Sequence, residues 1–158
     1  MTAIELITLI EAPVEICFQL SLSIDLELRA AQAHHLRAVG GVTSGIIGPG
    51  QRVAWKTKQF GVAVSHVSEI TGFEHPLFFQ DRMVSGVFKS FRHDHFFQPL
   101  GVDKTEMRDL LHFSMPLWML GAVSERLVIR RRLTQLLLLR NRLIQDEAIA
   151  AKARLKQH

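Results

Sequence analysis

Residues 117–155 read LWMLGAVSERLVIRRRLTQLLLLRNRLIQDEAIAAKARL, and this stretch decides the fold because no other segment can form so long a helix. It contains no proline and one glycine, and it is rich in leucine, arginine, glutamine and alanine, which favour helix. An apolar stripe at helical spacing comprises Ile129, Leu133, Leu136, Leu137 and Ile144. Val128, Leu138 and Leu139 point away from the stripe, and Arg140 falls within it. The sequence therefore predicts a long C-terminal helix with apolar surface to spare.

Ahead of this helix lies a run of predicted strands. Between residues 42 and 115, β-branched and aromatic side chains dominate and turn signals recur regularly. The predicted strands are 42–47, 51–60, 62–73, 77–84, 88–98 and 104–114. Gly48-Pro49-Gly50 is expected to close a hairpin between the first two of them. Short connections between consecutive strands favour an antiparallel meander.

The N-terminal segment adds one strand and two short helices. Residues 2–11 alternate in a way that predicts a half-buried strand. A first helix is predicted over 13–21, with Pro13 in its first turn. A second is predicted over 25–34, with Asp25 as its N-cap.

This order of elements predicts an α+β fold. Seven strands form a curved antiparallel sheet wrapped around the long C-terminal helix, with two short helices between strands 1 and 2. A sheet with one apolar concave face must be covered, and only the C-terminal helix is long enough to cover it. The 158 residues, 47% of them apolar, suit one domain over 1–158 with its own core, with 150–158 as a frayed tail.

Composition also bears on the cellular location of the protein. No apolar run approaches the roughly 18 residues of a membrane span, and the first ten residues carry no lysine or arginine, so no secretory signal is expected. The single cysteine, Cys17, has no partner for an internal disulfide, which suits a reducing compartment. We therefore predict a cytoplasmic protein without an integral membrane segment.

The net charge of +4 invites a nucleic-acid interpretation. The arginines of the C-terminal helix, however, are scattered among leucines and do not form a phosphate-binding cluster. No nucleic-acid partner is predicted.

Several local strings resemble the SRPBCC superfamily, which includes the START domains, the birch-pollen allergens and the polyketide cyclase/dehydrases. The strings are Ala12-Pro13-Val14-Glu15, Gly41-Val42-Thr43-Ser44-Gly45, Val53-Ala54-Trp55, Gln59-Phe60-Gly61-Val62, Phe91-Arg92-His93-Asp94-His95 and Met115-Pro116-Leu117. The resemblance covers roughly residues 3–147. It implies the helix-grip fold with an elongated cavity between the sheet and the long helix. Because the superfamily holds carriers, sensors and cyclases, it does not transfer a reaction.

Strand alternation selects the side chains expected to face this cavity. The predicted ligand-binding residues are Trp55, Thr57, Gln59, Phe79, Asp81, Met83, Phe91, His93, His95, Phe97, Met107, Asp109 and Phe113. An apolar wall with a few polar groups is typical of a small-molecule pocket. The first hypothesis is a carrier or sensor that binds a hydrophobic small molecule: a lipid, a sterol-like compound or an aromatic polyketide-like compound.

A second hypothesis is an enzyme of the cyclase, dehydratase or isomerase type. Asp109 would orient His93 or His95 as a general acid or base. Hydrogen bonds that merely satisfy these buried groups are the structural alternative. The two histidines with Asp81 or Asp109 are a weak metal pattern, so neither a metal nor a cofactor is predicted.

A third hypothesis concerns the spare apolar side chains of the C-terminal helix. Val128, Leu138 and Leu139 are candidates for a homodimer contact or for weak contact with a membrane surface beside the arginines.

Overall fold

The computed structural model describes residues 1–59, 62–116 and 123–157, and the side chains of all of these except 59, 62 and 123–126. The elements are β1 (Thr2–Ile10), α1 (Val14–Ser21), α2 (Ile24–Ala30), the 3₁₀ helix η1 (Gln32–His34), β2 (Arg37–Gly41), β3 (Arg52–Gln59), β4 (Val62–Glu74), β5 (Phe78–Ser85), β6 (Ser90–Pro99), β7 (Thr105–Ser114) and α3 (Val123–Leu155). The predicted α+β order of elements is confirmed.

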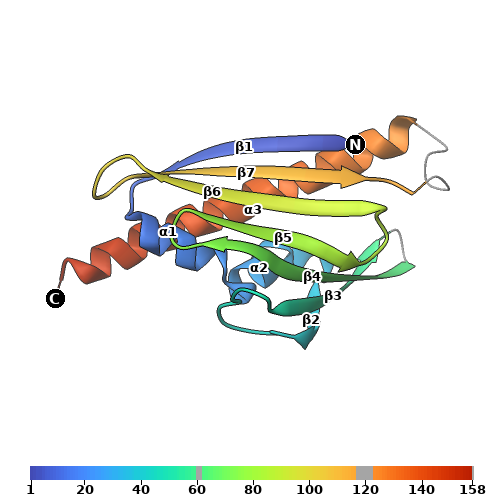
Figure 1. Cartoon of the computed structure of the whole chain (residues 1–158), viewed down its shortest axis with the longest axis horizontal. Helices are drawn as coiled ribbons and strands as arrows, with labels where there is room; N and C mark the ends of the chain where they lie inside the picture. Colours follow the sequence, from blue (N-terminus) through green and yellow to red (C-terminus); the bar gives the residue numbers. More distant parts are fainter. Residues whose placement is uncertain (60–61, 117–122, 158) are drawn as a thin grey trace.

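The strands of the described residues form one seven-stranded sheet in the order β1-β7-β6-β5-β4-β3-β2, with every neighbouring pair antiparallel. β2 to β7 are a meander, and β1 closes the far edge beside β7. Figure 1 shows the curved sheet in front and α3 running behind it. One face of the sheet therefore meets helices and the other lies open.

α3 is 33 residues long and covers the concave face of the sheet. Ile144 and Ala148 are fully buried, and Leu137 is nearly so. The segment 117–122 of the predicted helix lies outside the described residues. The helix continues to Leu155, where a frayed tail was predicted, and Nζ of Lys156 lies 3.0 Å from Oδ2 of Asp103.

The predicted strand 42–47 is wrong, because β2 lies earlier in the chain. Gly41 adopts φ +68°, and a Cβ atom there would lie 2.1 Å from the carbonyl oxygen of Arg52. The chain therefore leaves the sheet at this glycine. The segment after it pairs instead with the connection between α1 and α2, where Ile47 N–H donates to the carbonyl of Leu22 at 3.0 Å.

The second helix is shorter than predicted, and its cap differs. α2 begins after Ser23, whose hydroxyl accepts from the amide of Leu26 at 3.3 Å. Asp25 instead accepts the amide of Gly45 at 3.0 Å, so its carboxylate holds the connecting loop. Pro13 occupies the N-cap position of α1, one residue before the helix begins, whereas the sequence predicts it within the first turn.

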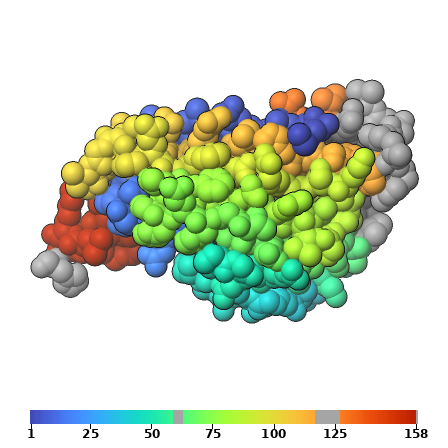
Figure 2. All heavy atoms as spheres, viewed as in Figure 1, coloured from blue at the N-terminus to red at the C-terminus, as the bar shows by residue number. Residues whose placement is uncertain are grey.

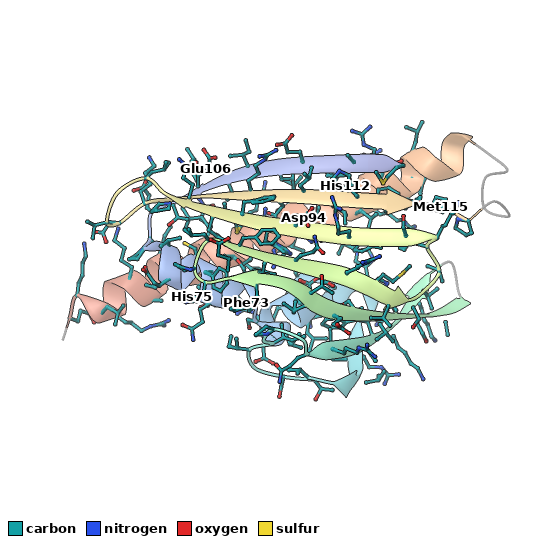
Figure 3. All side chains as sticks on the ribbon, in the orientation of Figure 1. Phe73, His75, Asp94, Glu106, His112 and Met115 are labelled. Carbon is teal, nitrogen blue, oxygen red and sulfur yellow. The ribbon has the colours of Figure 1, made fainter. Side chains whose placement is uncertain are left out.

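The outer face of the sheet lies open to solvent (Figure 2). Figure 3 labels Asp94 and His112 on this face, on neighbouring strands β6 and β7. On α3, Leu138 and Leu139 are each 44% exposed, as their position off the apolar stripe predicts. Among the described helices, none has the length and apolar character needed to cross a bilayer.

Candidate functional site

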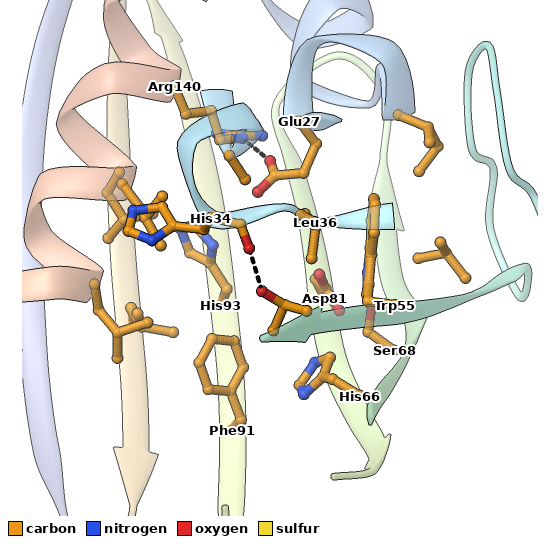
Figure 4. Close-up of a pocket in the computed structure, with 18 of the residues that line it drawn as sticks. Glu27, His34, Leu36, Trp55, His66, Ser68, Asp81, Phe91, His93 and Arg140 are labelled. Atoms are coloured by element: carbon orange, nitrogen blue, oxygen red, sulfur yellow. Dashed lines mark hydrogen bonds and ion pairs between the residues drawn. The ribbon is translucent and has the colours of Figure 1, made fainter. Parts of the chain in front are cut away.

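A cavity of about 580 Å³ lies between α3, the short helices and the concave face of the sheet. Figure 4 shows part of its lining. The apolar lining includes Ile24, Ile47, Val53, Trp55, Val64, Ile70, Phe79, Phe91, Leu111, Ile129, Leu133 and Leu137. The polar lining includes Ser21, Ser23, Glu27, His34, Thr57, His66, Ser68, Asp81, His93, His95, Arg132 and Arg140. The volume is within the range of small-molecule sites, about 300–1,000 Å³.

The structure brings seven of the predicted side chains to this cavity: Trp55, Thr57, Phe79, Asp81, Phe91, His93 and His95. Gln59, also predicted, is among the residues whose side chains the structure does not describe. The remaining predicted side chains, Met83, Phe97, Met107, Asp109 and Phe113, do not line the cavity. The predicted site is therefore broader than the cavity.

Packing against helices and neighbouring aromatic rings explains most of these differences. Phe97 is buried against Phe18 of α1, with ring centroids 5.3 Å apart, and Met107 is buried where Ser21 of α1 approaches it. Phe113 packs against Phe88 at the other end of the sheet. These side chains face inward as predicted, but neighbouring side chains cover them and the cavity does not reach them.

Asp109 lies behind the cavity wall at the centre of a buried polar cluster. His93 Nε2 donates to its Oδ1 at 3.0 Å, and Asn141 Nδ2 donates to its Oδ2 at 2.7 Å. His95 Nδ1 lies 2.8 Å from Oδ1 without the geometry of a hydrogen bond. Arg140 Nη1 lies 3.8 Å from the same oxygen. The cluster joins β6, β7 and α3, so it ties the helix to the sheet.

Within this cluster, Asp109 is ionised and His95 is neutral. Burial alone would raise the pKa of Asp109, but the hydrogen bond from His93 and the close approach of His95 outweigh it and hold that pKa well below 3.8. Burial, together with the nearby charge of His93, holds the pKa of His95 well below its usual range. An ionised carboxylate accepts only, so His93 carries the proton on Nε2. His95 is neutral and stacks on Phe79, with ring centroids 4.1 Å apart.

The ligand atoms of His93, His95 and Asp109 lie within 4.8 Å of one another, which is close enough for one metal ion. Both oxygens of Asp109 already accept hydrogen bonds, and the guanidinium of Arg140 adds a positive charge beside them. These contacts favour a hydrogen-bonded cluster, and we assign no metal to it.

Arg140 is a site residue that the sequence analysis did not assign, and the signal was its position inside the apolar stripe. Its side chain is 8% exposed. Nε donates to Glu27 at 2.8 Å and Nη2 donates to the carbonyl of Ser21 at 2.7 Å, whereas Nη1 has no hydrogen bond among the described residues. Arg140 interrupts the apolar stripe of α3 because its guanidinium binds Ser21 of α1 and Glu27 of α2.

Two further lining groups have shifted pKa values because they are buried. Burial raises the pKa of Asp81 to about 6, although His93 and Ser68 act in the opposite direction. Burial lowers the pKa of His66 to about 4, so its imidazole is neutral at pH 7. His66 and Ser68 lie on the same face of β4 as Val64 and Ile70, an alternation that would have found them.

Neither family models nor curated protein sequences match this chain. Solved structures do. The Zhui aromatase/cyclase from a Streptomyces strain gives a TM-score of 0.72 at 11% identity, covering 93% of each chain. A Thermus thermophilus protein gives 0.70 at 17% identity over 93% of this chain and 99% of its own. A START superfamily protein from Mycobacterium smegmatis gives 0.63 at 13% identity over 94% and 98%. The chain therefore has the helix-grip fold, as predicted.

Proposed function

We propose that this helix-grip chain binds a hydrophobic small molecule in the cavity beneath α3, as a carrier or sensor. The observation that carries the proposal is the cavity itself, about 580 Å³ with a mostly apolar wall. Burial of apolar ligand surface there contributes roughly 25 cal/mol per Å² before the cost of association. Trp55 and Phe91 offer flat aromatic surfaces that suit a lipid, a sterol-like compound or an aromatic polyketide-like compound.

Filling the cavity should weaken binding of an apolar probe. Ile129 and Leu133 line the cavity from α3, and their double replacement I129W/L133W places two indoles inside it. We expect the affinity for the uncharged fluorophore prodan, measured by fluorescence titration, to fall at least about tenfold because apolar contact area is lost.

The matched control is the double variant L138W/L139W, which adds the same side chains to the exposed face of the same helix. It should bind prodan as the wild type does. Equal losses in both variants, or no binding by the wild type, would contradict a cavity site.

The second candidate function is acid–base catalysis in the same cavity, favoured by the 3.0 Å hydrogen bond between His93 and Asp109. His93 lines the cavity while Asp109 lies behind it, which is the order that an orienting carboxylate requires. The reaction would be of the cyclase, dehydratase or isomerase type, with His93 moving a proton.

Proton exchange on a simple ketone tests this candidate. In D₂O, the protein should speed deuterium uptake at the methyl group of 2-acetylnaphthalene, followed by proton NMR. His93→Gln should lower the catalysed rate by about 10² or more while leaving the affinity within a few-fold. Exchange no faster than in buffer would remove the enzymatic hypothesis and leave the carrier hypothesis standing.

Two further expectations accompany the proposed function. We expect a cytoplasmic carrier, in keeping with the single buried cysteine, Cys17. Val128, Leu138 and Leu139 are exposed on α3 and remain candidates for a homodimer or membrane-surface contact.

A further inference from the structure

A row of polar side chains crosses the concave face of the sheet, one strand after another. Ser68 lies on β4, Asp81 on β5, His93 on β6 and Asp109 on β7. Asp81 stands directly opposite His93 in the β5–β6 ladder. The row passes from the open cavity at Asp81 to the buried cluster at Asp109, so its two ends have different surroundings.

The two carboxylates of this row differ in how far the protein satisfies them. Asp109 is fully buried and accepts hydrogen bonds on both oxygens. Asp81 is half-buried and lines the cavity, and its Oδ1 has no hydrogen-bond partner among the described residues. His93, the Ser68 hydroxyl and Arg140 favour its ionised form, but burial outweighs them and raises its pKa. The carboxylate of Asp81 therefore offers a hydrogen-bond acceptor at the cavity wall that the described residues do not use.

The charged groups of the cavity lining include a second carboxylate, Glu27, that acts on Asp81. The titratable and charged side chains that line the cavity around it are Glu27 from α2, His34 from η1, His66 from β4, His93 and His95 from β6, and Arg132 and Arg140 from α3. Arg140 already pairs with Glu27 and with the carbonyl of Ser21, and its Nη1 lies 3.8 Å from Oδ1 of Asp109. A ligand carboxylate at this point would meet both Asp81 and Glu27, and like charges at short range repel.

Aromatic side chains flank the same spot. In Figure 4, Asp81 lies between Trp55 and His93, with His66 and Phe91 nearby. His66 and Phe91 pack edge to face, with ring centroids 5.2 Å apart. A flat apolar body can therefore lie against these rings while its polar end reaches the Asp81 carboxylate.

We propose that the cavity selects an apolar molecule whose polar end donates a hydrogen bond to Asp81, that is an alcohol, a phenol or an amine, and that it discriminates against carboxylic acids. This inference rests on the proposed binding function and specifies the ligand class for the same cavity. A hydrogen bond to an ionised acceptor is roughly twice as strong as a neutral one, which is the source of the selectivity.

Four naphthalenes with the same ring body test the inference: 2-naphthol, 2-naphthylmethylamine, 2-methoxynaphthalene and 2-naphthoic acid. Equilibrium dialysis at pH 7.5 measures each dissociation constant. For the wild type we expect the naphthol and the amine to bind about tenfold more tightly than the methoxy compound, and the acid to bind most weakly. A gain for the amine alone would show that charge is required, and a gain for both would show that any donor suffices; either result supports the inference.

Substitutions locate the selectivity. Asp81→Leu should bring the naphthol, the amine and the methoxy compound to within about threefold of one another and should improve binding of the acid. Asp81→Asn should keep a reduced preference for the naphthol, because its amide oxygen still accepts. The control is Asp94→Asn, which changes a buried carboxylate on the outer face of the same sheet and should keep the wild-type order.

Acidification provides a second readout from the same dialysis. As the pH falls below about 6, Asp81 takes up a proton, so the disadvantage of the acid should shrink in the wild type and stay constant in Asp81→Leu.

Two outcomes would overturn the inference, and they differ from failure of the proposed function. A methoxy compound that binds the wild type as tightly as the naphthol, or an unchanged order in Asp81→Leu, would refute donor selection while leaving the cavity as a binding site. Binding of none of the four compounds would remove the proposed function and this inference together.

Discussion

Asp109→Ala is expected to lower the free energy of unfolding by about 3–5 kcal/mol, because it removes one partner of a fully buried charged cluster. His93 and Asn141 would lose their acceptor, and Arg140 would lose the negative charge 3.8 Å away. Urea unfolding followed by circular dichroism measures the loss. Since the pKa of Asp109 is held below its ordinary value of 3.8, this stability is present above that pH and is lost as the pH falls further.

Asp94→Ala provides the comparison. Asp94 is also buried, but its partners are Gln80 at 2.6 Å and the half-exposed Arg92, on the outer face of the sheet. Water can replace it there, so the expected loss is about 1 kcal/mol. Equal losses for the two variants would show that the Asp109 cluster does not hold α3 to the sheet.

Asp81→Asn is expected to change stability in the opposite direction. The pKa of Asp81 is raised from 3.8 to about 6, so above pH 6 the folded protein holds an ionised carboxylate that burial disfavours. Two pKa units correspond to about 3 kcal/mol, so at pH 8 the variant should be more stable than the wild type by roughly that amount. Below pH 3.8 the carboxyl is protonated in both folded and unfolded chains, and the difference should vanish.

Thermal unfolding at pH 8 and at a pH below 3.8 measures this difference directly. A variant that is less stable than the wild type at pH 8 would mean that the Asp81 carboxylate has protein partners that stabilise its charge. A substitution that raises stability and also weakens ligand selectivity would exchange function for stability, as expected where a binding group is kept unpaired.

The local patterns of the chain were enough to predict most of the fold. Alternation along 88–98 and 104–114 assigned Phe91, His93 and Asp109 to the concave side, because a strand buried on one face has little freedom of register. The prediction of a strand over 42–47 was wrong. The β-branched residues of this segment are typical of a strand, but Gly41, which has a positive φ, turns the chain away from the sheet. That turn brings Gly41 close to the carbonyl oxygen of Arg52 on β3. The local sequence pattern cannot predict this contact, because Arg52 lies farther along the chain.

The candidate site was predictable only in part, for a related reason. Alternation tells which face a side chain is on, but it does not tell where a helix rests on that face. Phe97 and Met107 face inward like His93, yet α1 lies near them and leaves no space. Arg140 could be noticed as an interruption of the stripe, but its contacts with Glu27 and Ser21 arise only when α3 meets the short helices.

The most direct test of a binding cavity beneath α3 is an amide NMR titration of the ¹⁵N-labelled protein with 2-naphthol. We predict saturable shifts concentrated at Trp55, Ser68, Asp81 and Phe91, which surround the cavity. Shifts gathered instead around the shallow outer groove at Phe78 and Phe96, or no saturable shifts at all, would contradict it.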